Sequence, residues 1–121
     1  MHKKNLTHEQ IKVLKYKDTE YPFTGKYLYH DDEGVYRCAG CDSPIFSSES
    51  KYDSGCGWPA FDDVVDKNAV ELILDESHGM IRTEVICKKC GGHLGHVFDD
   101  RSQKTGKWYC INSAALDFKK K

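Results

Sequence analysis

The sequence lacks any long hydrophobic run, and this absence argues against a membrane protein. The opening stretch, MHKKNLTHEQ, has basic residues but no apolar segment behind them. A signal peptide and a membrane-spanning helix both need such a segment. We therefore expect a cytoplasmic protein with no membrane partner.

The sequence also lacks an excess of charge of either sign. It has 18 lysines and arginines against 19 aspartates and glutamates, which gives a formal net charge of -1 at pH 7. Nucleic-acid-binding proteins usually carry a large basic excess, because their binding releases counterions from the phosphates. We expect no nucleic-acid partner, and the three lysines at 119–121 predict only a solvated basic tail.

Internal repeats and low-complexity linkers are absent as well, which leaves no sign of a domain boundary. A chain of 121 residues, 39% hydrophobic and 31% charged, has the size and composition of one ordinary globular domain. We therefore treat residues 1–121 as a single domain.

The residues that are present predict a mainly β fold. Near the N-terminus, Thr7 and Gln10 have the spacing of a capping box, which predicts a short helix beginning there. From Gly34 onward, short runs of β-branched and aromatic residues alternate with turn residues, which is typical of antiparallel strands. The predicted strands are 35–37, 44–46, 70–74, 81–86, 93–98, 108–111 and 115–118.

Four of the six cysteines form two C-x-x-C pairs, Cys38 with Cys41 and Cys87 with Cys90. The two-residue spacer lets both thiolates of a pair bind one ion, and Gly91 permits a tight turn after the second pair. Four thiolates favour zinc, in a closed and hence structural site that cross-links two distant hairpins. Local disulfides or thioredoxin-like redox motifs are the alternatives, and a reducing cytosol disfavours the disulfides.

The other two cysteines, Cys56 and Cys110, have no neighbouring partner in the sequence. Each is either a small buried hydrophobic residue or a reactive thiol. The flanking sequence favours reactivity, because Cys56 lies in the glycine-rich loop DSGCGWPAF and Cys110 precedes the polar pair Asn112 and Ser113.

Two histidines, His93 and His96, occur in the stretch GGHLGHVFDD. Residues three apart on a regular strand face opposite sides, so both can enter one site only if the strand bulges or turns at Gly95. Either histidine alone is as often a core or surface residue. Together with two free thiols, the pair indicates redox chemistry with proton transfer.

The stretches CAGC, YDSGCGWPAF, CKKCGGHLGHVFDD and WYCINSA, in this order, resemble the type B peptide-methionine (R)-S-oxide reductases, as does the leading EYPFTGKY. The resemblance covers roughly residues 6 to 118. It implies two antiparallel β-sheets with short N-terminal helices, and a four-cysteine zinc site remote from the active site.

The resemblance also implies the roles of the site residues. Cys110 is the nucleophile that attacks the sulfoxide sulfur of methionine-R-sulfoxide, free or in a protein. His93 or His96 assists the departing oxygen, and Asn112 orients polar groups near the nucleophile. Cys56 resolves the resulting sulfenic acid as a disulfide, which thioredoxin reduces.

Trp58, by the same resemblance, forms an apolar wall for the S-methyl group of the substrate, although simple core packing is the alternative. One position departs from the family pattern: Trp108 stands two residues before the nucleophile, where the family commonly has arginine. A nearby cation lowers the pKa of a thiol, so Cys110 depends on other groups for its ionisation.

Two other functions remain compatible with parts of the sequence. A non-enzymatic zinc-bearing β module that binds a partner or small ligand needs the four paired cysteines, but not Cys56, Cys110 and both histidines. A general thiol-disulfide oxidoreductase is a weaker alternative, because neither free cysteine lies in a C-x-x-C motif and no βαβ pattern is present.

Overall fold

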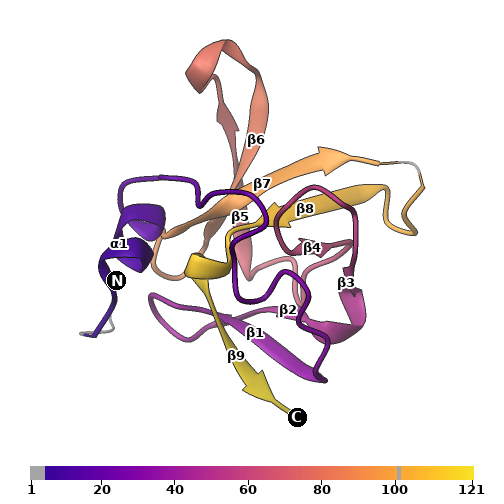
Figure 1. The fold of residues 1–121 in the computed structure, drawn as a ribbon. Coiled ribbons are helices and arrows are strands. Elements are labelled where there is room, and N and C mark those ends of the chain that lie inside the picture. The colour runs from indigo at the N-terminus through magenta and orange to yellow at the C-terminus, as the bar shows by residue number, and fades with distance from the viewer. Residues whose placement is uncertain (1–4, 101) are drawn as a thin grey trace.

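The computed structural model describes residues 5–100 and 102–121, which form two antiparallel β-sheets and one α-helix (Figure 1). The predicted mainly β fold with two antiparallel sheets is thus confirmed. The described N-terminal region has one α-helix, where the resemblance implied helices in the plural. No helix in the described ranges has both the length and the apolar character that crossing a bilayer requires.

The helix α1 (His8–Leu14) begins as its sequence predicts. The Thr7 hydroxyl accepts a hydrogen bond from the Gln10 backbone N–H at 3.1 Å, and the Gln10 side chain accepts one from the Thr7 N–H at 2.8 Å. This capping box satisfies two backbone donors that the first helical turn leaves free. Val13 and Leu14 are buried at the end of α1, which packs against β7 and the short helix η3 (Ser113–Ala115).

The smaller sheet has three strands in the order β2 (Pro44–Ser47), β1 (Gly34–Cys38) and β9 (Leu116–Lys120). The predicted strand at 115–118 is displaced, because Ala115 belongs to η3 and β9 runs on into the lysines. Lys119 and Lys120 pair with Val35 and Gly34. The basic segment is therefore partly strand rather than a free tail, although its side chains are exposed.

The larger sheet has six strands and carries most of the residues discussed below. Its order is β3 (Lys51–Tyr52), β4 (Ala60–Phe61), β8 (Lys107–Ile111), β7 (His93–Asp99), β6 (Arg82–Cys87) and β5 (Val70–Asp75). The strands β3 and β4 were not predicted, because two-residue strands have no detectable alternation. The β5–β6 hairpin, joined by η2 (Ser77–Gly79), projects from the body of the protein (Figure 1). We call this projecting hairpin the arm.

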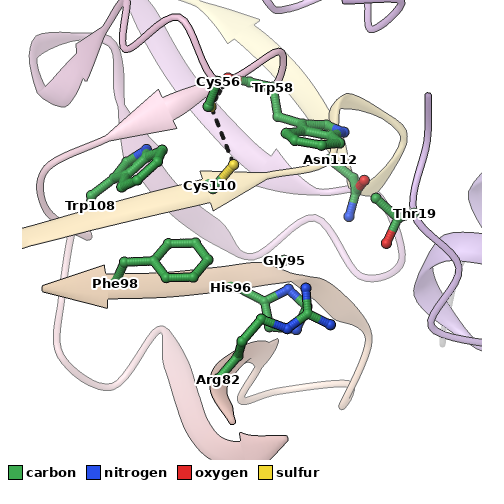
Figure 2. A pocket seen from close by; sticks show the side chains of 10 residues that line it. All are labelled: Thr19, Cys56, Trp58, Arg82, Gly95, His96, Phe98, Trp108, Cys110 and Asn112. Atoms are coloured by element: carbon green, nitrogen blue, oxygen red, sulfur yellow. Dashed lines mark hydrogen bonds between the residues drawn. The ribbon is translucent and has the colours of Figure 1, made fainter. Parts of the chain in front are cut away.

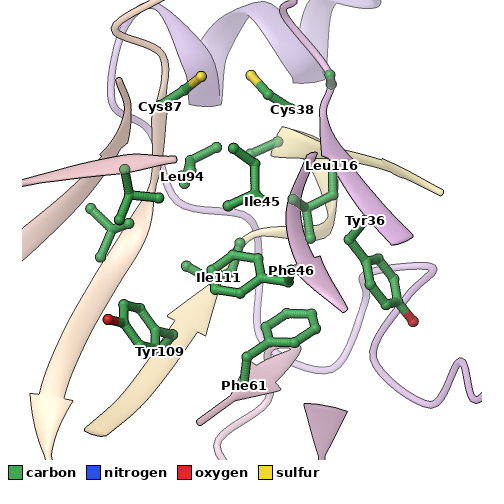
Figure 3. Packing of buried hydrophobic residues seen from close by; sticks show 14 of the residues in the cluster. Tyr36, Cys38, Ile45, Phe46, Phe61, Cys87, Leu94, Tyr109, Ile111 and Leu116 are labelled. Carbon is green, nitrogen blue, oxygen red and sulfur yellow. The ribbon is translucent and has the colours of Figure 1, made fainter. Parts of the chain in front are cut away.

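The hydrophobic core contains side chains from both sheets, as Figure 3 shows. Phe46 of the smaller sheet stacks on Phe61 of the larger one, with ring centroids 4.2 Å apart and planes inclined by 12°. Both rings are fully buried, and burying a phenylalanine side chain contributes roughly 1.5 to 3 kcal/mol. This packing fixes β4 beside β8, and so fixes the position of the loop that precedes β4.

Candidate active site

Cys110 lies in the middle of the larger sheet, on β8. Its backbone pairs with Ala60 of β4 on one side and with His96 of β7 on the other. Directly opposed residues of neighbouring antiparallel strands project from the same face of a sheet. The register therefore places the Cys110 thiol and the His96 imidazole on one face.

Cys56 reaches the same place from the loop before β4. Its Sγ atom lies 3.3 Å from the Sγ atom of Cys110, as Figure 2 shows. Gly55 and Gly57 flank it with φ angles of 75° and 95°, and a Cβ atom on Gly57 would come within 2.7 Å of Pro22. Glycine is therefore required for the turn that brings the two thiols together. The structure brings together two cysteines that are 54 positions apart in the sequence.

A hydrogen bond joins the two cysteines, and either sulfur can be its donor. The hydrogen bond from Cys110 lowers the pKa of Cys56 to about 5, with smaller contributions from Ser54 and Trp58. The same bond, together with burial, raises the pKa of Cys110. Of the two cysteines, Cys56 therefore ionises first.

A cavity of about 160 Å³ opens beside the thiols. Its walls include Cys56, Cys110 and His96, and the aromatic side chains Trp58, Phe98 and Trp108. In the view of Figure 2, Trp58 and Trp108 lie on either side of the cysteine pair. The cavity thus combines a thiol with apolar walls, which suits a small substrate group that is itself apolar except at its reacting atom.

Glu20 holds the cavity wall in place, and the sequence analysis missed it. Its carboxylate accepts hydrogen bonds from the backbone N–H groups of Ser113 and Ala114 at 3.0 and 2.9 Å. Its carbonyl oxygen accepts one from the Trp58 indole Nε1 at 3.0 Å. Hydrogen bonds to a charged group are worth about 1.5 to 3 kcal/mol each, so the Glu20 carboxylate fixes the segment before Pro22 against η3. The backbone carbonyl of Glu20 orients Trp58.

Asn112 is buried directly after β8, with an exposed fraction of 3%. Its side-chain oxygen accepts from the Glu20 backbone N–H at 3.1 Å, and its Nδ2 donates to the Leu94 carbonyl oxygen at 3.1 Å. Both polar atoms of its side chain thus bind backbone. Asn112 lines the cavity, and its predicted role in orienting polar groups stays a prediction.

The two histidines lie on one face because β7 has a bulge. Consecutive residues of β6, Val85 and Ile86, pair with Gly95 and His93, so β7 has one extra residue between them. The bulge that the sequence analysis required at Gly95 is confirmed. It brings the imidazole rings of His93 and His96 together, with centroids 5.5 Å apart.

The environments of the two histidines nevertheless differ. His96 lines the cavity, whereas His93 is buried behind it, with its Nδ1 atom 2.8 Å from the Glu84 carboxylate. Burial lowers the pKa of His93, and the hydrogen bond to Glu84 opposes that shift. By position, His96 is the better candidate for direct contact with a substrate, and His93 lies behind it.

Trp108 occupies the cavity wall where the family pattern leads one to expect arginine. Its ring packs on Phe98, with centroids 5.1 Å apart, and its buried Nε1 has no hydrogen-bond partner among the described residues. The cation of this cavity instead comes from the arm, since Arg82 also lines it. Arg82 could not be assigned to the cavity from the sequence, because its location there depends on the register of three neighbouring strands.

The four paired cysteines form a separate cluster between the two sheets. Cys38 ends β1 and Cys87 ends β6, and Figure 3 shows their sulfurs turned toward each other. The Sγ atoms of Cys38 and Cys90 are 3.6 Å apart, as are those of Cys41 and Cys87, and all four lie within 4.8 Å of one another. A tetrahedral zinc ion with Zn–S bonds of about 2.3 Å requires sulfur separations of about 3.8 Å. The cluster therefore fits a four-thiolate metal site.

The backbone around this cluster is also suited to thiolates. Gly40 and Gly92 donate their N–H groups to the sulfurs of Cys38 and Cys90, both at 3.4 Å. Gly91 has a φ angle of 77°, which confirms the tight turn predicted after the second pair. Each sheet supplies one cysteine pair, so a bound ion cross-links the two sheets at a place that shares no residue with the cavity.

Comparison with known proteins places these features in one family. The SelR domain family matches residues 6–120, a range that contains all six cysteines. The chain is 53% identical over 116 residues to a peptide methionine sulfoxide reductase MsrB of Hahella chejuensis, covering 96% of this chain and 84% of that protein. A protein of the same name from Leptospira interrogans is 53% identical over 118 residues, covering 98% and 90%. The mitochondrial methionine-R-sulfoxide reductase B3 of Mus musculus is 53% identical over 116 residues, covering 96% and 46%.

Proposed function

Because the chain belongs to the SelR domain family of type B methionine-R-sulfoxide reductases, we propose that it reduces methionine-R-sulfoxide to methionine with Cys110 as the nucleophile. One observation carries the assignment of the nucleophile: Cys110 pairs with His96 in the β7–β8 register, inside an aromatic-walled cavity where the Cys56 Sγ atom lies 3.3 Å from its own. A non-enzymatic zinc-bearing module has no need of this arrangement, which argues against the alternative raised by the sequence.

The first step transfers oxygen from the substrate to the enzyme. The Cys110 thiolate attacks the sulfoxide sulfur to form an S–S bond, and His96 delivers a proton to the sulfoxide oxygen, which weakens the bond of that oxygen to the methionine sulfur. The protonated oxygen then moves to the Cys110 sulfur as both of these bonds to the methionine sulfur break. The methionine sulfur is reduced by two electrons and the Cys110 sulfur is oxidised by two, to a sulfenic acid. The methionine thioether then leaves the cavity.

The aromatic walls select the substrate. Trp58, held by its hydrogen bond to Glu20, and Phe98 give the S-methyl group an apolar surface close to the thiol. Burying one methyl group contributes about 0.8 kcal/mol, so this contact orients the sulfoxide more than it binds it. The sulfoxide oxygen is then left facing the polar side of the cavity, where His96 lies.

The second step regenerates the enzyme. The Cys56 thiolate attacks the sulfur of the Cys110 sulfenic acid, which forms one S–S bond, breaks the S–O bond and, with one added proton, releases the oxygen as water. A sulfur separation of 3.3 Å must shrink to about 2.05 Å, a small movement for a loop with glycines on both sides of Cys56. An external dithiol, for which thioredoxin is our candidate, reduces the disulfide by thiol exchange. Such recycling fits a cytoplasmic location, where thiols are kept reduced.

We assign zinc to the four-cysteine cluster as a structural ion. Four thiolates complete a tetrahedral shell and leave no position open for substrate. The ion then holds β1 and β6 together, and the chemistry proceeds elsewhere on the larger sheet.

The reductase function is tested with the two epimers of methionine sulfoxide and dithiothreitol as reductant. We expect loss of the R epimer and persistence of the S epimer, measured by chiral chromatography of both residual epimers. Undiminished R epimer under these conditions would overturn the proposed function.

The role of Cys56 is tested separately with Cys56→Ser. We expect thioredoxin-driven turnover to fall by roughly 100-fold or more, because no disulfide forms for thioredoxin to reduce, while dithiothreitol still reduces the sulfenic acid directly. Dimedone labelling followed by mass spectrometry should detect Cys110 sulfenic acid in this variant after one turnover. Equal thioredoxin rates in Cys56→Ser and wild type would exclude Cys56 as the resolving cysteine.

A further inference from the structure

The base of the arm contacts the histidine that lines the cavity. The Nε2 atom of His96 lies 2.8 Å from Oδ2 of Asp75, the last residue of β5. Arg82, the first residue of β6, donates from Nη2 to the same oxygen at 3.5 Å. Asp75 lies on β5 and His96 on β7, with β6 between them, so this contact links two strands that do not pair with each other.

The protonation of Asp75 determines which atoms donate in this contact. Hydrogen bonds from Ser77 and His96 hold the pKa of Asp75 well below its usual range, so the group is a carboxylate at neutral pH. An ionised carboxylate only accepts hydrogen bonds. The hydrogen between the two groups therefore belongs to Nε2 of His96, and a neutral His96 ring carries its lone pair on Nδ1.

In the described part of the chain, the carboxylate that His96 hydrogen-bonds is that of Asp75. Glu84, which pairs with His96 in the backbone register, directs its side chain to His93 and Lys17. Asp75 and His96 have side-chain exposures of only 18% and 12%, so water screens their contact far less than it screens a surface ion pair. Each of the two histidines thus has a carboxylate of its own.

We propose that Asp75 is a positioning residue for the reductase reaction, which fixes His96 as the Nε2–H tautomer and so makes Nδ1 the nitrogen that carries the proton. The Cys110 thiol gives its proton to Nδ1, and the imidazolium then gives that proton to the sulfoxide oxygen, so His96 ends as it began. Asp75 stabilises the intervening imidazolium, and Arg82 holds the Asp75 carboxylate in place. This inference rests on the proposed function, and it assigns the arm a part in forming the active site.

The first test is the activity of Asp75→Asn. We expect kcat for methionine-R-sulfoxide to fall by roughly 10- to 100-fold with KM within about twofold, because the substrate walls are unchanged while proton transfer loses its orientation. Asparagine keeps an oxygen that can accept from the Ser77 N–H, which Oδ1 of Asp75 binds at 2.9 Å, so the arm should retain its turn. Asp75→Glu, which keeps the carboxylate, should recover part of kcat.

Glu71→Gln is the matched control. Glu71 lies on the same strand, is exposed and loses the same charge on substitution. We expect its kcat to stay within about twofold of wild type. An equal loss in both variants would mean that only the charge of the arm matters, and would overturn the proposal, as would an unchanged kcat in Asp75→Asn.

The second test measures the tautomer of His96 directly, by the ¹⁵N chemical shifts of its ring nitrogens at about pH 9, where histidine is neutral. Wild type should show the hydrogen on Nε2, and Asp75→Asn should show a mixture or the Nδ1–H form. A wild-type Nδ1–H tautomer would overturn the proposal without any variant. Because this readout needs no turnover, it distinguishes failure of the Asp75 assignment from failure of the reductase function.

Discussion

Cys110→Ser is expected to abolish reduction of methionine-R-sulfoxide, with a loss in kcat/KM of about 10⁴-fold or more. A serine hydroxyl does not ionise near neutral pH, and it has no oxidation state corresponding to the sulfenic acid. His96 and the aromatic walls remain in the variant, but they have no atom to which the substrate oxygen can be transferred. The measurement is R-epimer loss with dithiothreitol, compared with wild type at equal protein concentration.

The structure makes this substitution a clean one. Cys110 contributes its backbone to ladders with both Ala60 and His96, and serine keeps these hydrogen bonds. Cys56→Ser is the matched control, because it removes the other thiol of the pair but leaves the first chemical step intact. Retention of more than a few per cent of wild-type activity in Cys110→Ser would assign the nucleophile elsewhere.

The cysteine pattern was readable from the sequence because its chemistry depends on short spacings. The two C-x-x-C pairs predicted a four-thiolate cluster, and the sulfurs do converge. The capping box at Thr7 was readable for the same reason, since both partners lie within one helical turn. The capping box was predictable because its two partners are three residues apart. The four-cysteine cluster was predictable because two C-x-x-C pairs are typical ligands of one metal ion, even when the pairs are distant in the sequence.

The contact between Cys56 and Cys110, by contrast, was not predictable from local sequence patterns. Nothing in the spacing of Cys56 and Cys110 indicates contact, and only the resemblance to a family implied it. The structure explains the contact through Phe61, which packs in the core and anchors β4, so that the preceding loop lies over β8. Long-range register of this sort depends on the whole core, which a local pattern does not encode.

Residues that support the site from outside its motifs were missed altogether. Glu20 lies 93 positions from Ser113, and Asp75 lies 21 positions from His96, and each binds its partner through a single carboxylate. A lone acidic residue in a strand or loop looks like any solvated charge. Only burial and hydrogen-bond geometry distinguish these two from the exposed carboxylates elsewhere on the chain.

The arm supplies the cavity with a cation, although position 108 holds tryptophan where the family commonly has arginine. The cavity retains a guanidinium, but Arg82 supplies it from β6 and binds the Asp75 carboxylate with it. On the proposed mechanism, Arg82 therefore affects Cys110 indirectly, because it positions the Asp75 carboxylate that orients His96. On the proposed mechanism, ionisation of Cys110 depends on His96 as proton acceptor, and the tautomer of His96 should therefore affect activity more than the residue at position 108.

Loss of the metal should have the largest effect on stability. We expect Cys87→Ser to lower the free energy of unfolding by roughly 3 kcal/mol or more, and to reduce the zinc content of the purified protein from one ion per chain. Cys87 ends β6 in the larger sheet and Cys38 ends β1 in the smaller one, so an ion bound by both cysteines cross-links the two sheets. Without the ion, the three sulfurs that remain in this variant provide no cross-link between the sheets.

Urea denaturation followed by tryptophan fluorescence measures this loss, and elemental analysis measures the metal. Cys56→Ser is again the control, since it removes a thiol that binds no metal and should keep both the midpoint and the zinc. Because the cavity shares no residue with the cysteine cluster, folded Cys87→Ser molecules should still reduce the R epimer. A metal-free wild-type protein with an unchanged midpoint would contradict the structural role of zinc, and would leave the two sheets held by the core alone.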